Sequence, residues 1–155
     1  MKKLLTVFGT MLSLFSVSSS ASASQVTVSQ PFRLMVGEPS VFEFQAPRGT
    51  LSVVFEDDGE TGYFYALDYS SASQPIQEAV HIYDVMSVVG RDRPSVVRIA
   101  WSADATKASL WINDYPHAVF DFAAKRGYAR SNFPPPRKWK SHDFSWDDQI
   151  LKYFR

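Results

Sequence analysis

The amino-acid sequence predicts an α+β domain, in which an antiparallel sheet of about six to eight strands carries one main α-helix and a short C-terminal helix. Most of the chain between residues 32 and 122 consists of short runs in which side chains alternate between apolar and polar. That period of two is typical of strands. Residues 76–86 repeat their apolar side chains at helical spacing instead, which predicts the main helix.

Composition favours a globular domain and excludes several chemistries. The chain has 155 residues, of which 45% are hydrophobic and 15% aromatic, enough for a substantial core. Its 16 basic residues balance its 16 acidic ones, so no basic excess indicates nucleic-acid binding. It has no cysteine, which excludes disulfides, thiolate catalysis and zinc sites built on cysteine.

The N-terminus has the features of a secretory signal peptide. Lys2 and Lys3 precede an apolar run over residues 4–17, and small residues follow it up to the Ala21-Ser22-Ala23 cleavage signal. This run is too short for a membrane span. We therefore expect residues 1–23 to be removed and residues 24–155 to form a single α+β domain in the periplasm or outside the cell, with no remaining span.

The strands follow from the alternating runs, and turn residues separate them. The predicted strands are 32–36, 41–45, 51–56, 63–68, 96–101, 108–112 and 117–122. In the last hairpin, a simple turn would place Ile112 opposite His117 and Leu110 opposite Val119. Trp111 and Phe120 would then share the other face. Because both faces carry bulky apolar groups, we expect the main helix to cover one and the C-terminal segment the other.

The hairpin formed by 51–56 and 63–68 is the most distinctive feature of the sequence. Asp58-Gly59 predicts a tight turn, because glycine adopts positive φ without a steric clash. We expect Gly62 to adopt a second unusual conformation where the strand resumes. The loop gathers four carboxylates, those of Glu56, Asp57, Asp58 and Glu60. They are either a solvated hairpin end or a site for a cation, such as calcium, or for a basic partner.

The predicted helices carry further polar groups. Glu78, His81 and Asp84 are three residues apart and would lie on one side of the main helix. This triplet suits acid–base chemistry or metal binding, but it also suits a solvated helix face. At the C-terminal helix, Ser145 is the expected N-cap, with Asp148 in the capping-box position.

Several phrases together resemble a bacterial family of small proteins classed as a domain of unknown function. They are EDDGETGYFYALD at 56–68, AVHIYDV at 79–85, IAWS at 99–102, LWINDYPHAVFDF at 110–122 and GYARSNFPPP at 127–136. The resemblance covers about residues 32–146 and excludes the signal peptide. It implies no activity and no catalytic residues.

No motif assigns an enzymatic function. The chain has no nucleophile elbow, P-loop or dinucleotide fingerprint, so we name no catalytic residue, no metal and no cofactor. Our leading hypothesis is a non-enzymatic protein-binding module of the bacterial envelope, similar in role to an immunity protein, whose partner has a basic surface. The alternatives are a small carbohydrate-active hydrolase that uses carboxylates and a structural envelope protein. The candidate binding residues are Glu56, Asp57, Asp58, Glu60, Tyr63, Tyr65, Glu78 and His81.

Overall fold

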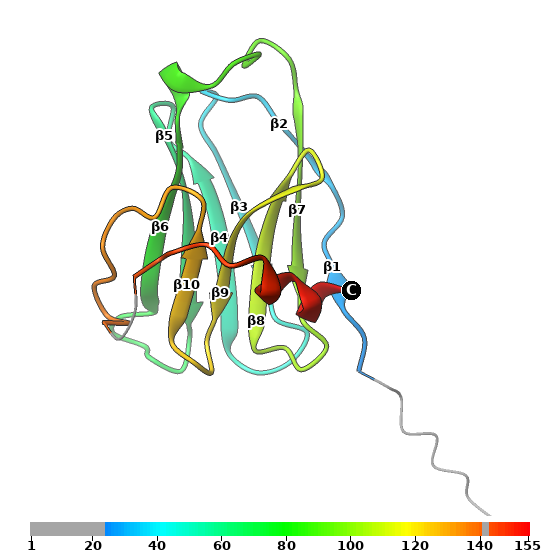
Figure 1. The fold of residues 1–155 in the computed structure, drawn as a ribbon, viewed down its shortest axis with the longest axis vertical. Coiled ribbons are helices and arrows are strands. Elements are labelled where there is room, and N and C mark those ends of the chain that lie inside the picture. The colour runs from blue at the N-terminus through cyan, green and yellow to red at the C-terminus, as the bar shows by residue number, and fades with distance from the viewer. Residues whose placement is uncertain (1–23, 141–142) are drawn as a thin grey trace, which may run out of the picture.

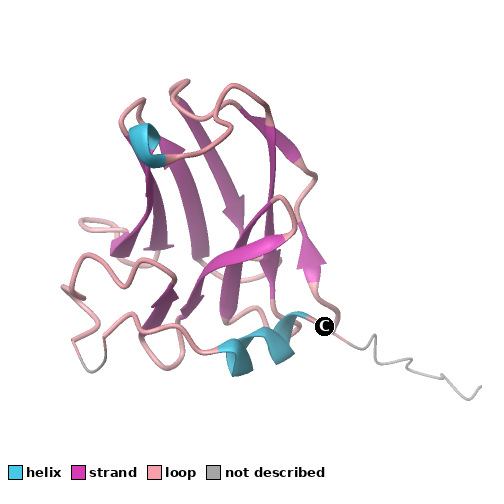
Figure 2. Cartoon of the chain, turned by 45° about the horizontal axis from the view of Figure 1, so that its top comes forward, coloured by secondary structure: helices cyan, strands magenta, loops and turns pink. Residues whose placement is uncertain are grey.

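The computed structural model describes residues 24–140 and 143–155, so the predicted signal peptide lies outside the described residues. Within these ranges the chain forms two antiparallel β-sheets that pack face to face (Figures 1 and 2). The predicted α+β class is therefore wrong, because no α-helix packs on either sheet in the described ranges and the two sheets cover each other instead.

The larger sheet has six strands and contains both the first and the last strand of the described chain. Its path runs β1-β7-β8-β9-β10, and β2 also pairs with β7. The strands are β1 (Thr27–Val28), β2 (Phe32–Leu34), β7 (Ser95–Trp101), β8 (Lys107–Ile112), β9 (Tyr115–Asp121) and β10 (Arg126–Ala129). All of these pairs are antiparallel.

The smaller sheet is a four-stranded meander in the order β3-β4-β5-β6. Its strands are β3 (Ser40–Gln45), β4 (Leu51–Asp57), β5 (Thr61–Asp68) and β6 (Ile76–Asp84). The predicted hairpin of residues 51–68 is present as β4 and β5. Short connections between consecutive strands explain why each strand lies beside its neighbour in the sequence.

The predicted main helix is strand β6, which pairs with β5 along its length. Val80 is fully buried, and Ile82 and Tyr83 pack against the core. The register shifts between Gly62 and Tyr63, so two consecutive residues of β6 can turn toward the core. That irregularity interrupts the period of two and leaves apolar spacings that resemble those of a helix.

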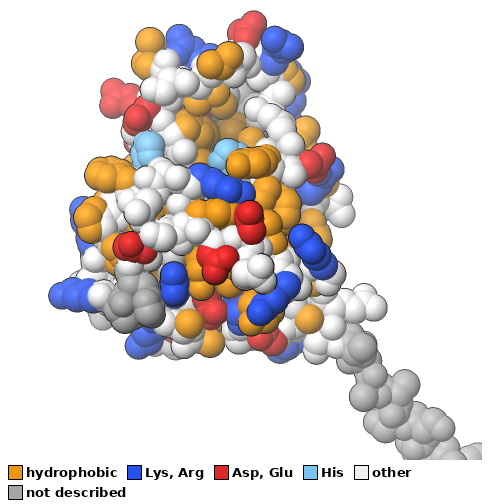
Figure 3. Space-filling model, in the orientation of Figure 1, with side chains coloured by type: hydrophobic (Ala, Val, Ile, Leu, Met, Phe, Trp, Pro, Cys, Tyr) orange, Lys and Arg blue, Asp and Glu red, His pale blue; other side chains and the backbone are white. Residues whose placement is uncertain are grey.

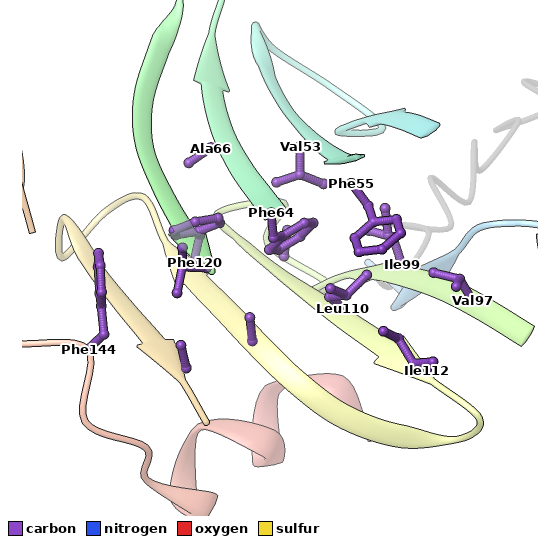
Figure 4. Packing of buried hydrophobic residues seen from close by; sticks show 14 of the residues in the cluster. Val53, Phe55, Phe64, Ala66, Val97, Ile99, Leu110, Ile112, Phe120 and Phe144 are labelled. Atoms are coloured by element: carbon purple, nitrogen blue, oxygen red, sulfur yellow. The ribbon is translucent and has the colours of Figure 1, made fainter. Parts of the chain in front are cut away.

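The core lies between the two sheets (Figure 4). Phe64 of β5 and Phe120 of β9 stack with ring centroids 5.2 Å apart, and both are fully buried. Val53, Phe55, Ile99 and Leu110 fill the same layer from both sheets. Burial of these apolar side chains is the main stabilising contribution to the packing of one sheet on the other.

The β8–β9 hairpin differs from the predicted register by one residue at Leu110 and by two at Ile112. Leu110 pairs with Ala118 and Ile112 with Tyr115, and an irregularity follows Leu110. Trp111 does not share a face with Phe120. It is half-buried on the outer face of the larger sheet, where its indole N–H donates to the Ser109 hydroxyl at 2.8 Å.

The C-terminal segment covers part of the larger sheet and closes one side of the fold (Figure 2). Trp139 packs edge-on against Phe120 with centroids 5.6 Å apart, and Phe144 is fully buried. The chain then forms a 3₁₀ helix, η2 (Asp148–Phe154), in place of the predicted C-terminal helix. Its cap is Asp147, whose carboxylate accepts from the Gln149 N–H at 2.9 Å, and not Ser145.

Candidate functional site

The predicted turn between β4 and β5 is present, and its two glycines have different roles. Gly59 has φ of +95°, as the Asp-Gly dipeptide predicts. Gly62 does not adopt positive φ, which corrects that expectation. It is needed for space, because a Cβ there would lie 2.6 Å from the Tyr83 ring.

Asp57 is a structural carboxylate and not an exposed member of an acidic cluster. Its side chain is buried and accepts hydrogen bonds from the Gly37 N–H at 2.8 Å, the Gly59 N–H at 2.8 Å and the Tyr83 hydroxyl at 2.7 Å. Burial, followed by this bond to Asp57, raises the pKa of Tyr83. Asp57 therefore joins three parts of the chain and is unavailable to a ligand.

Asp58 also serves the turn, although it is exposed. Its carboxylate accepts from the Thr61 N–H at 2.7 Å and the Glu60 N–H at 2.9 Å. These two backbone hydrogen bonds lower the pKa of Asp58. Glu56 is half-buried on the neighbouring strand and accepts from the Tyr65 hydroxyl at 2.9 Å. In the part of the chain that the structure describes, only Glu60 of the four carboxylates makes no side-chain hydrogen bond or ion pair.

The hairpin tip is joined to the segment that follows β6. The Glu60 carbonyl accepts from the Val85 N–H at 2.8 Å, which ties the tip to the short 3₁₀ helix η1 (Val85–Ser87). Met86 and Val89 on this segment are 79% and 98% exposed. We define the tip surface as Asp58, Glu60, Asp84, Met86 and Val89. Apolar and charged side chains lie together at this end of the molecule (Figure 3).

Glu78 is buried and acts as an anchor for the C-terminal segment. One of its oxygens accepts from the N–H groups of Arg137 and Lys138, both at 3.2 Å, and of Trp139 at 3.1 Å. Charge-assisted bonds of this kind fix a segment strongly, because an unpaired buried carboxylate is costly. The proposed helical triplet with His81 and Asp84 does not exist, since Glu78 points to the core side of a strand.

His81 is half-buried on the opposite face of β6. Its Nε2 lies 3.0 Å from the Asp84 carboxylate, and its ring meets Tyr63 and Phe133 edge-on at 5.5 and 5.9 Å. Its backbone N–H donates to the Phe133 carbonyl at 2.9 Å. His81 therefore connects strand β6 to the proline-rich segment as well as to the sheet surface.

The structure places Tyr63 and Tyr65 in a hollow that the sequence did not predict. Their rings lie 6.0 Å apart on the outer face of the smaller sheet. Residues 133–138 stand beside β6 and form a wall, which leaves a groove of about 470 Å³. We call this hollow the tyrosine groove. Its wall lies more than fifty residues from its floor in the sequence, and no local pattern indicates such a contact.

The arrangement of the described residues supports neither a metal site nor a hydrolase that uses carboxylates. No group of three His, Asp or Glu side chains within 24–140 and 143–155 is arranged to hold a metal ion. The carboxylates of Asp57 and Glu78 are occupied by backbone N–H groups. Among the same residues, no helix is long and apolar enough to cross a bilayer.

A family profile described as "Uncharacterized protein conserved in bacteria (DUF2251)" matches residues 34–155. The chain belongs to this family. The sequence resemblance to an uncharacterised bacterial family is thereby confirmed. A relative from Haemophilus influenzae, itself named an uncharacterized protein, is 48% identical over 85 residues, which are 55% of this chain and 53% of the relative. No solved structure matches.

Proposed function

We propose that this DUF2251 protein is a non-enzymatic binding module of the bacterial envelope that docks through its tip surface onto a basic surface of a partner protein. The observation that carries the proposal is the exposure of Val89 and Met86, at 98% and 79%, beside the carboxylates of the tip. Exposed apolar groups rimmed by charge are typical of protein interfaces.

The tip surface is held in shape before any partner arrives. The carboxylates of Asp57 and Asp58 accept hydrogen bonds from backbone N–H groups of the turn, and the Glu60 carbonyl accepts one from the Val85 N–H. A preorganised surface loses less conformational entropy on binding. Methionine adapts to irregular partner surfaces, and the rim carboxylates of Glu60 and Asp84 would steer a basic partner toward the tip.

The comparison with immunity proteins is one of role and remains an analogy. The hydrolase alternative has less support, because Asp57 and Glu78 use their oxygens to hold backbone N–H groups. A structural envelope role would also fit a rigid sandwich, but it would not require exposed apolar groups at one end.

The tip surface is tested by replacing its apolar centre and its charge separately. Met86→Ser with Val89→Ser should abolish capture of the partner from a periplasmic extract. It should change the melting temperature little, because both side chains are exposed and the one hydrogen bond lost, from Arg91 to the Met86 sulfur, is also exposed. Glu60→Gln with Asp84→Asn should slow association and reduce its salt dependence. The measurement is quantitative pull-down followed by binding kinetics with the captured protein.

Val28→Ser is the matched control, since Val28 is 52% exposed on β1 of the other sheet. It should capture the same protein as the wild type. Equal capture by the double serine variant and the wild type would refute docking through the tip surface.

Export is proposed on the basis of the signal sequence. The described fold makes its first strand pair at Thr27, so cleavage after Ala23 removes none of its strands. We expect the protein purified from its native host to begin at Ser24 and to be found in the periplasm or the medium. Intact-mass measurement on each cell fraction decides this, and a cytosolic protein that retains residues 1–23 would contradict it.

A further inference from the structure

The tyrosine groove lies on the outer face of the smaller sheet and has a small residue at its floor. Tyr65 and Ala79 pair directly across β5 and β6. The flanking residues Phe64 and Val80 point into the core, so Tyr65 and Ala79 face outward. The Ala79 methyl group fills little of the space between the Tyr65 ring and the wall of residues 133–138, which accounts for the hollow.

The hollow continues across the sheet. A second depression of about 260 Å³ shares Tyr65 and Ile76 with the first and extends to Val54 on β4 and Val41 on β3. Neighbouring strands lie about 4.8 Å apart, so the path from β6 to β3 is about 14 Å, the length of about four extended residues. The shape therefore fits an elongated ligand that crosses the strands.

The charges at the wall favour an anion. Glu78 lines the groove, but the backbone N–H groups of the wall occupy its carboxylate. Lys138 also lines it, with its ammonium group on the Ile76 carbonyl at 2.9 Å. Arg137 is exposed, and its guanidinium has no hydrogen bond or ion pair with any residue of the described chain. The positive charge of Arg137 thus remains available to a carboxylate.

We propose that the tyrosine groove binds the last four or so residues of an extended peptide, with the terminal carboxylate at Arg137 and apolar side chains along Tyr65, Ile76 and Val54. The wall ends the groove beside Arg137, so a chain that crosses the strands toward the wall ends there, where its terminal carboxylate would meet the guanidinium. This site is separate from the tip surface and stands whether or not the tip docks a partner.

The lining favours a peptide over a glycan. Val41, Val54, Leu67 and Ile76 present hydrocarbon along the second depression, and its one carboxylate, that of Glu56, accepts a hydrogen bond from the Tyr65 hydroxyl at 2.9 Å. Sugar hydroxyls covered by such groups would lose their hydrogen bonds to water without replacement, whereas an extended peptide turns alternate side chains toward the lining and keeps its backbone N–H and C=O groups directed sideways, in contact with water. Apolar peptide side chains gain by the same burial, and aromatic and proline groups such as Phe133 and Pro134 suit them at the wall.

The test uses a defined probe, a pool of acetylated tetrapeptides randomised over leucine, valine, phenylalanine and tyrosine, with either a free or an amidated C-terminus. Titration of the ¹⁵N-labelled protein should shift the amide signals of Tyr65, Ala79 and Arg137. The free-carboxylate pool should bind about tenfold more tightly than the amidated pool, since a charge-assisted bond is lost in the latter. Arg137→Gln should remove that preference and leave binding of the amidated pool unchanged.

Two alanine substitutions form the matched steric comparison. Ala79→Trp should fill the groove and abolish binding, whereas Ala72→Trp, in the exposed loop before β6, should bind as the wild type does. Equal binding by the two pools, binding that survives Ala79→Trp, or shifts at the same amides with a chitin tetrasaccharide and not with the peptides would each overturn the proposal. Because Arg137 is exposed, Arg137→Gln keeps the test valid even if the tryptophan variant is unstable.

Discussion

Replacing Asp57 with alanine should lower the free energy of unfolding by about 3 kcal/mol, because it leaves buried donors unpaired. The Gly37 N–H, the Gly59 N–H and the Tyr83 hydroxyl all donate to this one carboxylate. Urea denaturation followed by tryptophan fluorescence measures the loss.

Glu60→Gln is the control for that change. The Glu60 carboxylate lies on the same turn but makes no side-chain hydrogen bond within the described chain. The Glu60→Gln variant should therefore be as stable as the wild type. Asp58→Ala should fall between the two, since its bonds to the Thr61 and Glu60 N–H groups are exposed. Equal stability of the Asp57 and Glu60 variants would show that the buried network is not formed.

Phe120→Ala should cost about 3–5 kcal/mol, as the loss of a buried aromatic side chain leaves a cavity. Its ring is fully buried and stacks on Phe64 of the other sheet, and it also meets Trp139 edge-on. Chemical denaturation gives the value. Combining it with Phe64→Ala should cost less than the two separate losses together, because the first change already removes the contact.

Trp111→Ala provides the contrast. Trp111 is half-buried on the outer face of the larger sheet. Trp111→Ala should therefore lower the free energy of unfolding clearly less than Phe120→Ala does, although the tryptophan ring is larger. A Trp111 variant less stable than the Phe120 variant would mean that the sandwich core lies elsewhere.

Local patterns were sufficient to predict seven of the ten strands in the described residues, and they missed β1, β6 and β10. The seven predicted runs all form strands, and the Asp58-Gly59 turn has the expected positive φ. Residues 76–86 were misassigned because the shift beside Tyr63 breaks the alternation of β6, and because Glu78 lies among apolar residues. A carboxylate in an apolar run indicates a helix surface unless its distant partners are known.

The roles of Glu78 and Asp57 could not be predicted, because their hydrogen-bond partners are distant in the sequence. Glu78 is bound by residues 137–139, and Asp57 by Gly37 and Tyr83. Each contact joins segments twenty or more positions apart, and the single sequence contains no signal for such pairs. Hence the eight candidate binding residues were grouped by chemical type, whereas the fold distributes them among a structural network, the tip surface and the tyrosine groove.

The pairing of β1 and β2 with β7 also determines when this protein can fold. The Ser29 N–H donates a hydrogen bond to the carbonyl of Ile99, seventy positions later, and the Ile99 N–H donates one to the Ser29 hydroxyl. During synthesis the first two strands must therefore wait until β7 has emerged from the ribosome, while the β3–β6 meander has its partners earlier. Contacts of such long sequence separation slow folding. For the export that we propose, the leader would reach the export machinery before the larger sheet could close, and the chain would be translocated unfolded.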